Sequence, residues 1–416
     1  MKIKKLIGVM SLAGLAVPGI AFATNGYFSG GFGVKSSGMA GVGIALPQDA
    51  LAAATNPAGM VMVGDRIDFG VTWFRPQRQS TIVGNSYGLD GTYDGNDTSN
   101  FFIPEFGYNK MLNPNMSVGV SVFGNGGMNT DYANNPFKNL GGQGNAGVDL
   151  SQLFIAPTFS MKINPDNAIG VSLNLAYQQF AAKGLQPFAG VGISASPTNV
   201  TNNGHDSSTG WGVRIGWTGQ VTPNVTFGAT YQTKTKMGKF SDYQGLFAEQ
   251  GAFDIPANYG VGIAVKVTPA TTVAADIQTI EYSDVKAIAN TLGQGGTLGQ
   301  DNGSGFGWRD MTVVKLGVSH TYNQNLTVRA GVSTGRQPIP SDQTFFNILA
   351  PGIVENQLTL GATWTLANKA ELSVSYMHAF DKTVNGVNSI PSSYGGGEAN
   401  LNMHEDALGV AYGWKI

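Results

Sequence analysis

The sequence predicts an all-β protein: a 14-stranded antiparallel transmembrane β-barrel with a small N-terminal hatch plugging the lumen. Three observations support this prediction. The chain starts with an export signal, alternating strands fill most of the remainder, and short turns alternate with long polar loops. Successive side chains of a strand point to opposite faces, so each alternating segment has one apolar and one polar face. Many such segments with small polar residues on the inner face are typical of a barrel in lipid.

Residues 1–23 have the parts of a secretory signal peptide. Three lysines near the start are followed by the apolar stretch 6–20 and by a small-x-small cleavage site at residues 21–23. An N-terminal membrane anchor is the less favoured alternative, because the stretch is shorter than the ~20 residues that a spanning helix needs. We therefore expect an exported chain that begins at Thr24.

Composition narrows the class further. The chain has no cysteine, so no disulfide framework is expected. The balance of 24 Lys+Arg against 26 Asp+Glu argues against nucleic acid as a partner. Charged residues make up 12% of the chain, about half the usual share in soluble domains, and the 59 glycines are about double the usual usage. One large barrel is expected, because no shift in composition divides the chain.

Six short turn signals, each flanked by alternating segments, predict six hairpins. Asn, Asp and Pro favour these turns because they preset or support the turn backbone. The turns lie at residues 113–115, 164–166, 222–224, 268–270, 323–325 and 367–369. A strand at 66–82 precedes the first hairpin and another at 403–416 follows the last, which makes fourteen strands, an even number as expected for bacterial barrels.

Seven longer connections rich in Gly, Asn, Asp and Ser join the hairpins. They cover residues 83–100, 125–149, 183–208, 239–251, 285–309, 338–353 and 381–402. Short turns on one side and long loops on the other are typical of the bacterial outer membrane, with the turns in the periplasm. We therefore assign residues 66–416 to a barrel surrounded by outer-membrane lipid.

Aromatic residues near the strand ends support a membrane setting, because amphipathic rings favour the interfaces. Those expected on the outward, apolar phase are Trp73, Tyr108, Tyr177, Trp217, Tyr231, Tyr282, Trp364, Tyr376, Tyr412 and Trp414.

Charged residues of both signs fall on the inward phase. They are Asp68, Glu105, Arg214, Lys266, Asp276, Lys315, Arg329 and Glu371. Ion pairs inside the lumen are the simplest role for any one of them. Arg214, Lys315 and Arg329 are also candidate partners for a ligand carboxylate, since a buried anion needs charge-assisted hydrogen bonds.

Catalytic signatures are weak. The four histidines lack metal-ligand spacing, no serine lies in a nucleophile elbow, and the Gly-x-Gly matches fall outside any βαβ unit. We expect no metal, no cofactor and no enzymatic activity, so a barrel enzyme acting on lipids is disfavoured.

The segment 24–65 lacks the alternation. It is rich in small residues, with a short helix expected around 50–54 that Asn56-Pro57 ends. A segment of this size is suited to plug a fourteen-stranded barrel, which lies between small filled barrels and open porins in width.

Several stretches resemble the FadL family of outer-membrane transporters for long-chain fatty acids and aromatic hydrocarbons. Residues 38–45 (GMAGVGIA), Asp49-Ala50 and then Asn56-Pro57-Ala58 are similar to the family's N-terminal hatch. Residues 122–128 (VFGNGGM) resemble the end of the third strand, where family members have a kink. Stretches within 275–283 and 308–340 are also similar, so the resemblance spans nearly the whole mature chain.

The resemblance implies passive transport. A hydrophobic molecule would land among the outer loops, enter a pocket blocked below by the hatch, and leave sideways through a gap at the kink. The kink residues would be Gly124, Asn125, Gly126 and Gly127, since glycine tolerates irregular backbone. The same glycines suit the start of an outer loop equally well. The alternative function is a general diffusion porin with an unplugged lumen.

Two features depart from the family. Such barrels usually end in an aromatic residue that the barrel assembly machinery recognises, and this machinery is an expected partner. This chain instead ends in Trp414-Lys415-Ile416. The long loops match poorly, so the resemblance does not choose among a fatty acid, an alkane and an aromatic hydrocarbon as the ligand.

Overall fold

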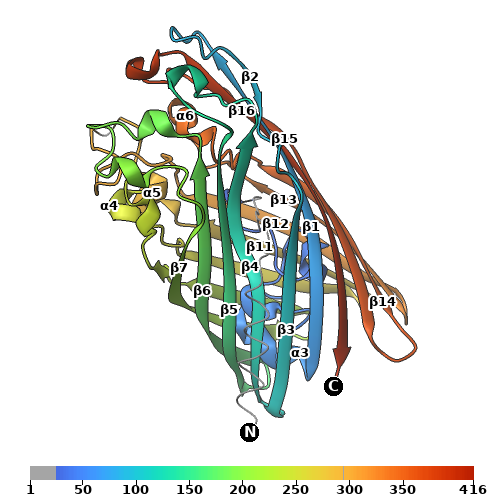
Figure 1. The fold of residues 1–416 in the computed structure, drawn as a ribbon. Helices are drawn as coiled ribbons and strands as arrows, with labels where there is room; N and C mark the ends of the chain where they lie inside the picture. The colour runs from blue at the N-terminus through green and yellow to red at the C-terminus, as the bar shows by residue number, and fades with distance from the viewer. Residues whose placement is uncertain (1–24, 294) are drawn as a thin grey trace.

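The computed structural model describes residues 25–293 and 295–416 (Figure 1). The predicted signal peptide at residues 1–23 lies outside the described residues. Sixteen strands of the described chain form one sheet, and every strand pairing in it is antiparallel. Two strands are short additions to the wall, namely β2 (Gly91–Asp94) and β9 (Lys236–Met237).

The other fourteen strands form a closed wall, which confirms the predicted fold class. They are β1 (Arg66–Val83), β3 (Phe101–Asn113), β4 (Met116–Tyr132), β5 (Ala146–Asn164), β6 (Asn167–Lys183), β7 (Asp206–Thr222), β8 (Val225–Gln232), β10 (Asn258–Thr268), β11 (Thr271–Ile280), β12 (Met311–Asn323), β13 (Leu326–Gly335), β14 (Asn356–Thr365), β15 (Glu371–Val384) and β16 (Glu398–Lys415). Pairing of β16 with β1 closes the barrel. All six predicted turns connect neighbouring strands of this wall.

Helices in the described chain are short. They are α2 (Val34–Ser37), α3 (Met60–Val63), α4 (Ala248–Gly251), α5 (Lys286–Ala289) and α6 (Thr344–Asn347), with 3-10 turns η1 (Ala52–Ala54), η2 (Pro57–Gly59), η3 (Lys138–Leu140), η4 (Gln186–Phe188), η5 (Pro197–Asn199), η6 (Ser241–Tyr243), η7 (Tyr282–Asp284), η8 (Ser341–Gln343) and η9 (Ser392–Tyr394). Among the described residues, none of these helices has the length and apolarity to cross a bilayer.

The wall strands present apolar side chains outward and polar ones inward. On β6, Val171, Leu173 and Leu175 are 41–43% exposed, whereas Ser172 and Asn174 between them are buried. This alternation is the arrangement that lipid outside and a filled lumen inside require.

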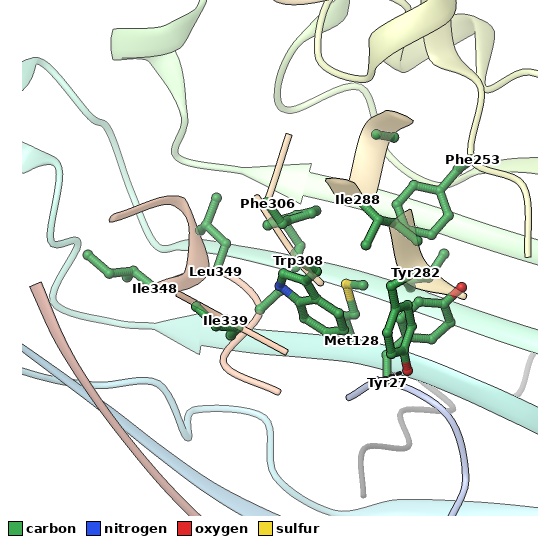
Figure 2. Packing of buried hydrophobic residues seen from close by; sticks show 14 of the residues in the cluster. Tyr27, Met128, Phe253, Tyr282, Ile288, Phe306, Trp308, Ile339, Ile348 and Leu349 are labelled. Carbon is green, nitrogen blue, oxygen red and sulfur yellow. Dashed lines mark hydrogen bonds between the residues drawn. The ribbon is translucent and has the colours of Figure 1, made fainter. Parts of the chain in front are cut away.

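The outer loops fold into an apolar core at one end of the barrel, where α4, α5 and α6 gather (Figure 1). Figure 2 shows Trp308 within this core, near Phe306 and Met128. The Trp308 Nε1–H donates to Asn347 Oδ1 (2.6 Å), so the only polar atom of the indole is satisfied although the ring is buried. The long connections are therefore packed structures rather than loose polar loops.

Tyr282 corrects one expectation about the aromatic residues. It was expected on the lipid-facing phase, but it is fully buried in η7 and packs against Tyr27 and Trp308 (Figure 2). The prediction was wrong because β11 ends at Ile280, so counting every second residue no longer applies at Tyr282.

The predicted loop 125–149 is also shorter than expected. β4 continues to Tyr132 and β5 starts at Ala146. From Phe123 to Met128 every residue of β4 is buried, because the described N-terminal residues and the outer loops cover it. With both faces covered, the strand has no polar phase, and the alternation that reveals strands disappears.

Candidate functional site

Residues 25–65, here called the N-terminal segment, lie against the inner surface of the wall. Wall glycines make room for it: a Cβ added at Gly216 would lie 1.9 Å from Asn56 Oδ1, and one at Gly170 would lie 2.3 Å from the carbonyl carbon of Pro57. Glycine at these two positions therefore lets the backbone of the segment approach the wall closely.

Asn56-Pro57-Ala58 joins this segment to the wall. Asn56 Oδ1 accepts the N–H of Ala58 (3.1 Å) as the cap of η2, which has Pro57 as its first residue. Asn56 Nδ2 donates to the carbonyls of Ile44 (2.7 Å) and Trp217 (3.0 Å). One side chain thus fixes the local turn, the segment and strand β7 together.

Inward carboxylates bind the backbone of the N-terminal segment. Asp276 Oδ2 accepts the N–H groups of Gly43 (2.8 Å) and Ile44 (3.1 Å). Asp68 Oδ2 accepts the N–H of Ala50 (2.9 Å). These acids satisfy buried donors that water cannot reach.

Each of the three predicted carboxylate partners also donates to the N-terminal segment. Arg214 donates to Thr55 O (3.0 Å) and Lys315 to Gly30 O (2.9 Å). Arg329 donates to Gln48 Oε1 (2.8 Å). All three thus have partners within the protein, and their role toward a ligand carboxylate stays a prediction.

Two other charged residues that were predicted to face the lumen differ in their surroundings. Glu371 pairs with Arg66 (2.9 Å) and with Lys35 of the N-terminal segment (2.5 Å), whereas Lys266 is exposed near a turn.

The seam between β3 and β4 is interrupted. Pairing runs from Asn113–Met116 to Phe106–Val122 and ends there. Beyond Phe106, residues 101–105 of β3 pair with β1, and in the described part of the chain they pair with no second strand. We call the gap between residues 101–105 and residues 123–128 the window.

The predicted kink residues lie on the β4 side of the window. Gly124 pairs with Leu153 and Gly126 with Gln152, so Asn125 is the extra residue of a β-bulge. Bulges bend a strand and increase its twist. The Asn125 side chain is buried and donates to Gln152 Oε1 (3.0 Å).

The N-terminal segment occupies the free edge of β4 at the bulge. The Ser29 N–H donates to Asn125 O (2.9 Å), and the Gly127 N–H donates to Tyr27 O (3.0 Å). A Cβ at Gly126 would lie 2.0 Å from Tyr27 O, so only glycine allows this approach. The Tyr282 hydroxyl donates to Asn25 O and holds the same segment (Figure 2 shows Tyr27 beside Tyr282).

Arg78 forms the upper border of the window. Arg78 is 2% exposed, and its guanidinium donates to Thr98 O (2.6 Å) and to Asn129 O of β4 (2.6 Å). Residues 95–98 continue this border, since Asp131 N–H donates to Gly95 O (3.0 Å). Arg78 was not among the predicted inward charges, although it lies on the same inward phase of β1 as Asp68.

A cavity lies directly behind the window. It holds about 710 Å³ of empty space, part of it open to solvent. Its apolar lining includes Phe32, Phe74, Ile103, Phe123, Gly124 and Met377. Glu105 also lines it, with its carboxylate oxygens accepting the N–H groups of Gly33 (3.1 Å) and Val34 (3.0 Å).

A second, more apolar pocket lies among the outer loops and holds about 460 Å³ of empty space, part of it open to solvent. Its lining includes Phe180, Phe188, Leu246, Phe247, Phe306 and Phe346.

The histidines are used locally. His205 pairs with Asp149 (2.9 Å) at the outer end of the barrel, and this hydrogen bond raises the pKa of His205 above its ordinary value. His320 contacts Thr271 and His378 contacts Asp406, while His404 lies 3.9 Å from Asp381. Within the described ranges, no three His, Asp or Glu side chains gather as metal ligands.

Solved structures share this architecture. The toluene transporter TodX of Pseudomonas putida superposes with a TM-score of 0.71 at 18% identity, covering 93% of this chain and 99% of that one. A FadL homologue from Pseudomonas aeruginosa gives a TM-score of 0.72 at 16% identity, covering 94% and 99%. The toluene transporter TbuX of Ralstonia pickettii gives 0.65 at 19% identity, covering 93% and 99%.

Curated sequences agree with the structural matches. The long-chain fatty acid transport protein of Escherichia coli K12 is 23% identical over 411 residues, covering 88% of this chain and 89% of that protein. Its counterpart in Salmonella typhi is 22% identical over 408 residues, covering 88% of each. The family model described as outer membrane protein transport protein (OMPP1/FadL/TodX) matches residues 20–415, so this chain belongs to that family and is a barrel of the outer membrane.

Proposed function

We propose that this chain lets hydrophobic small molecules cross the outer membrane by passive diffusion. The ligand binds the apolar pocket among the outer loops, moves to the cavity behind the window and leaves sideways between β3 and β4. Residues 25–65 act as the hatch that blocks the direct route to the periplasm. The observation that supports this route best is that the pairing of β3 with β4 stops beside an apolar cavity.

The energetics favour a lateral route for such a solute. An apolar molecule gains about 0.8 kcal/mol for each CH₂ that leaves water, so a path from pocket to cavity to lipid keeps it buried. Relatives named as long-chain fatty acid and toluene transporters support the same ligand class. A general diffusion porin is not favoured, because such a channel offers an apolar solute only water.

The lateral exit is tested by blocking the window from the lipid side. The chain has no cysteine, so Phe102→Cys gives a single labelling site on β3 beside the window. The unfolded chain is labelled with a bulky maleimide, refolded and reconstituted, and transfer of a hydrophobic tracer is measured. Val261→Cys on β10 is the matched control, since the two side chains are 57% and 58% exposed.

We expect the label at residue 102 to abolish most of the transfer and the label at residue 261 to leave it intact. Equal transfer by the two labelled proteins would sink the lateral route. The porin alternative predicts large, steady conductance steps in a planar bilayer, whereas a plugged lumen predicts a silent, folded barrel.

A further inference from the structure

The three predicted carboxylate partners donate to oxygens of the protein itself. Lys315 Nζ donates to the carbonyl of Gly30 (2.9 Å), a residue that lines the cavity, and to Gln278 Oε1 (3.3 Å). Arg329 donates to Gln48 and to Thr363 Oγ1 (2.7 Å), and Arg214 to Thr55 and to Gln232 Oε1 (2.6 Å). Among the described residues that line the cavity, there is no lysine or arginine.

The ionisable side chain in the cavity is an acid. Glu105 lies next to Ile103 on the β3 side of the window, so a ligand leaving through the window passes it. The hydrogen bonds from Gly33 and Val34 fix this carboxylate in place. A ligand anion here would lack a cationic partner and would face a fixed acid, and burying an unpaired charge is costly.

Hydroxyl groups in the same cavity suit an uncharged polar end. Ser37, Thr72 and Ser375 line it, and a hydroxyl can both donate and accept a hydrogen bond. The outer pocket sets the same requirement, since the described residues that line it include no charged side chain.

Building on the proposed function, we infer that this transporter selects uncharged hydrophobic molecules, namely hydrocarbons and alcohols, and discriminates against carboxylates of the same chain length. The cavity supplies apolar contact and hydroxyl partners but no cation for an acid headgroup. Glu105 adds an acid, and not a cationic partner, at the exit.

The test compares dodecan-1-ol with dodecanoate, two ligands that differ only at the headgroup. The refolded full chain in detergent is titrated at pH 8, and displacement of a fluorescent hydrophobic probe gives the two affinities. We expect the alcohol to bind about tenfold more tightly or better, equivalent to ~1.4 kcal/mol. Equal or tighter binding of dodecanoate would overturn the selectivity and leave the transport proposal standing. Failure of both ligands to bind would remove both.

A variant that introduces a positive charge tests whether the selectivity arises in this cavity. Met377→Lys places an ammonium group in the cavity lining, so the preference for the alcohol should shrink by about tenfold, because the carboxylate gains a partner. Met62→Lys is the matched control, since Met62 is 42% exposed in α3 and does not line the cavity. Heat-dependent gel mobility confirms that each barrel is folded. An unchanged preference in folded Met377→Lys would overturn the assignment of selectivity to this cavity.

Discussion

The seam between β16 and β1 and the seam between β3 and β4 are built from similar alternating strands, yet they differ in continuity. Each of the residues from Arg66 to Val83 has a partner on β16. Pairing of β3 with β4 instead stops at Phe106–Val122. In lipid, every backbone donor and acceptor must find a partner. The break persists because residues 27–29 and 95–98 supply bonds to β4 that β3 does not. An opening in such a wall therefore needs substitute partners as well as a bend.

Among the changes that test the window between β3 and β4, Gly126→Leu is expected to have the largest effect. The new side chain would overlap Tyr27 O, so residues 25–29 must leave the β4 edge or β4 must shift. Overpacking of this kind costs about 1–3 kcal/mol. We expect most tracer uptake to be lost while gel mobility still reports a folded barrel. In the control Gly238→Leu, the Cβ meets its nearest neighbour at 3.4 Å, an ordinary contact. Normal uptake by the Gly126 variant would argue against the window.

Arg78→Ala should loosen the upper border. The change leaves the carbonyls of Thr98 and Asn129 without their charged donor, and hydrogen bonds to charged groups contribute about 1.5–3 kcal/mol. We expect a lower free energy of unfolding and faster amide exchange at residues 95–98. Arg336→Ala, at an exposed arginine, is the control. Identical exchange in the two variants would show that Arg78 does not hold the border.

Two substitutions at Asn56 separate its roles. Asn56→Asp keeps the acceptor for the Ala58 N–H but removes the donors to Ile44 and Trp217, whereas Asn56→Ala removes both functions. Loss of such a cap costs about 0.5–2 kcal/mol. If the hydrogen bonds from Asn56 to Ile44 and Trp217 hold the hatch, both variants should show brief conductance flickers in planar bilayers. Flickers in the Ala variant alone would assign the anchoring to the cap.

The smallest effect is expected at the outer rim. Pairing with Asp149 raises the pKa of His205 in the folded protein, so its stabilisation is present below the ordinary pKa of about 6.5 and is lost as pH rises through the folded value. The pair is partly exposed, so we expect only about 0.2–1 kcal/mol. Melting temperatures at pH 5.5 and pH 8 should differ less in His205→Ala than in the parent chain. An equal difference would exclude this pair as a source of the pH dependence.

Sequence reasoning succeeded where one face of a strand meets lipid and the other meets the lumen. This is the case for β6, where Val171 and Ser172 lie on opposite faces. The six turns and the number of wall strands were predicted from such segments. Sequence reasoning failed on residues 125–132, where both faces are covered and the alternation is lost. The ligand role of Arg214, Lys315 and Arg329 stays a prediction, and their protein partners could not be predicted because they depend on the path of the N-terminal segment.

The burial of Asn25 constrains when the predicted removal of residues 1–23 could take place. Asn25 is 1% exposed and Tyr27 is fully buried, only a few residues beyond the predicted cleavage site after residue 23. A peptidase needs an extended, accessible substrate on both sides of the bond that it cuts. Cleavage at the predicted site would therefore have to come before this stretch is enclosed.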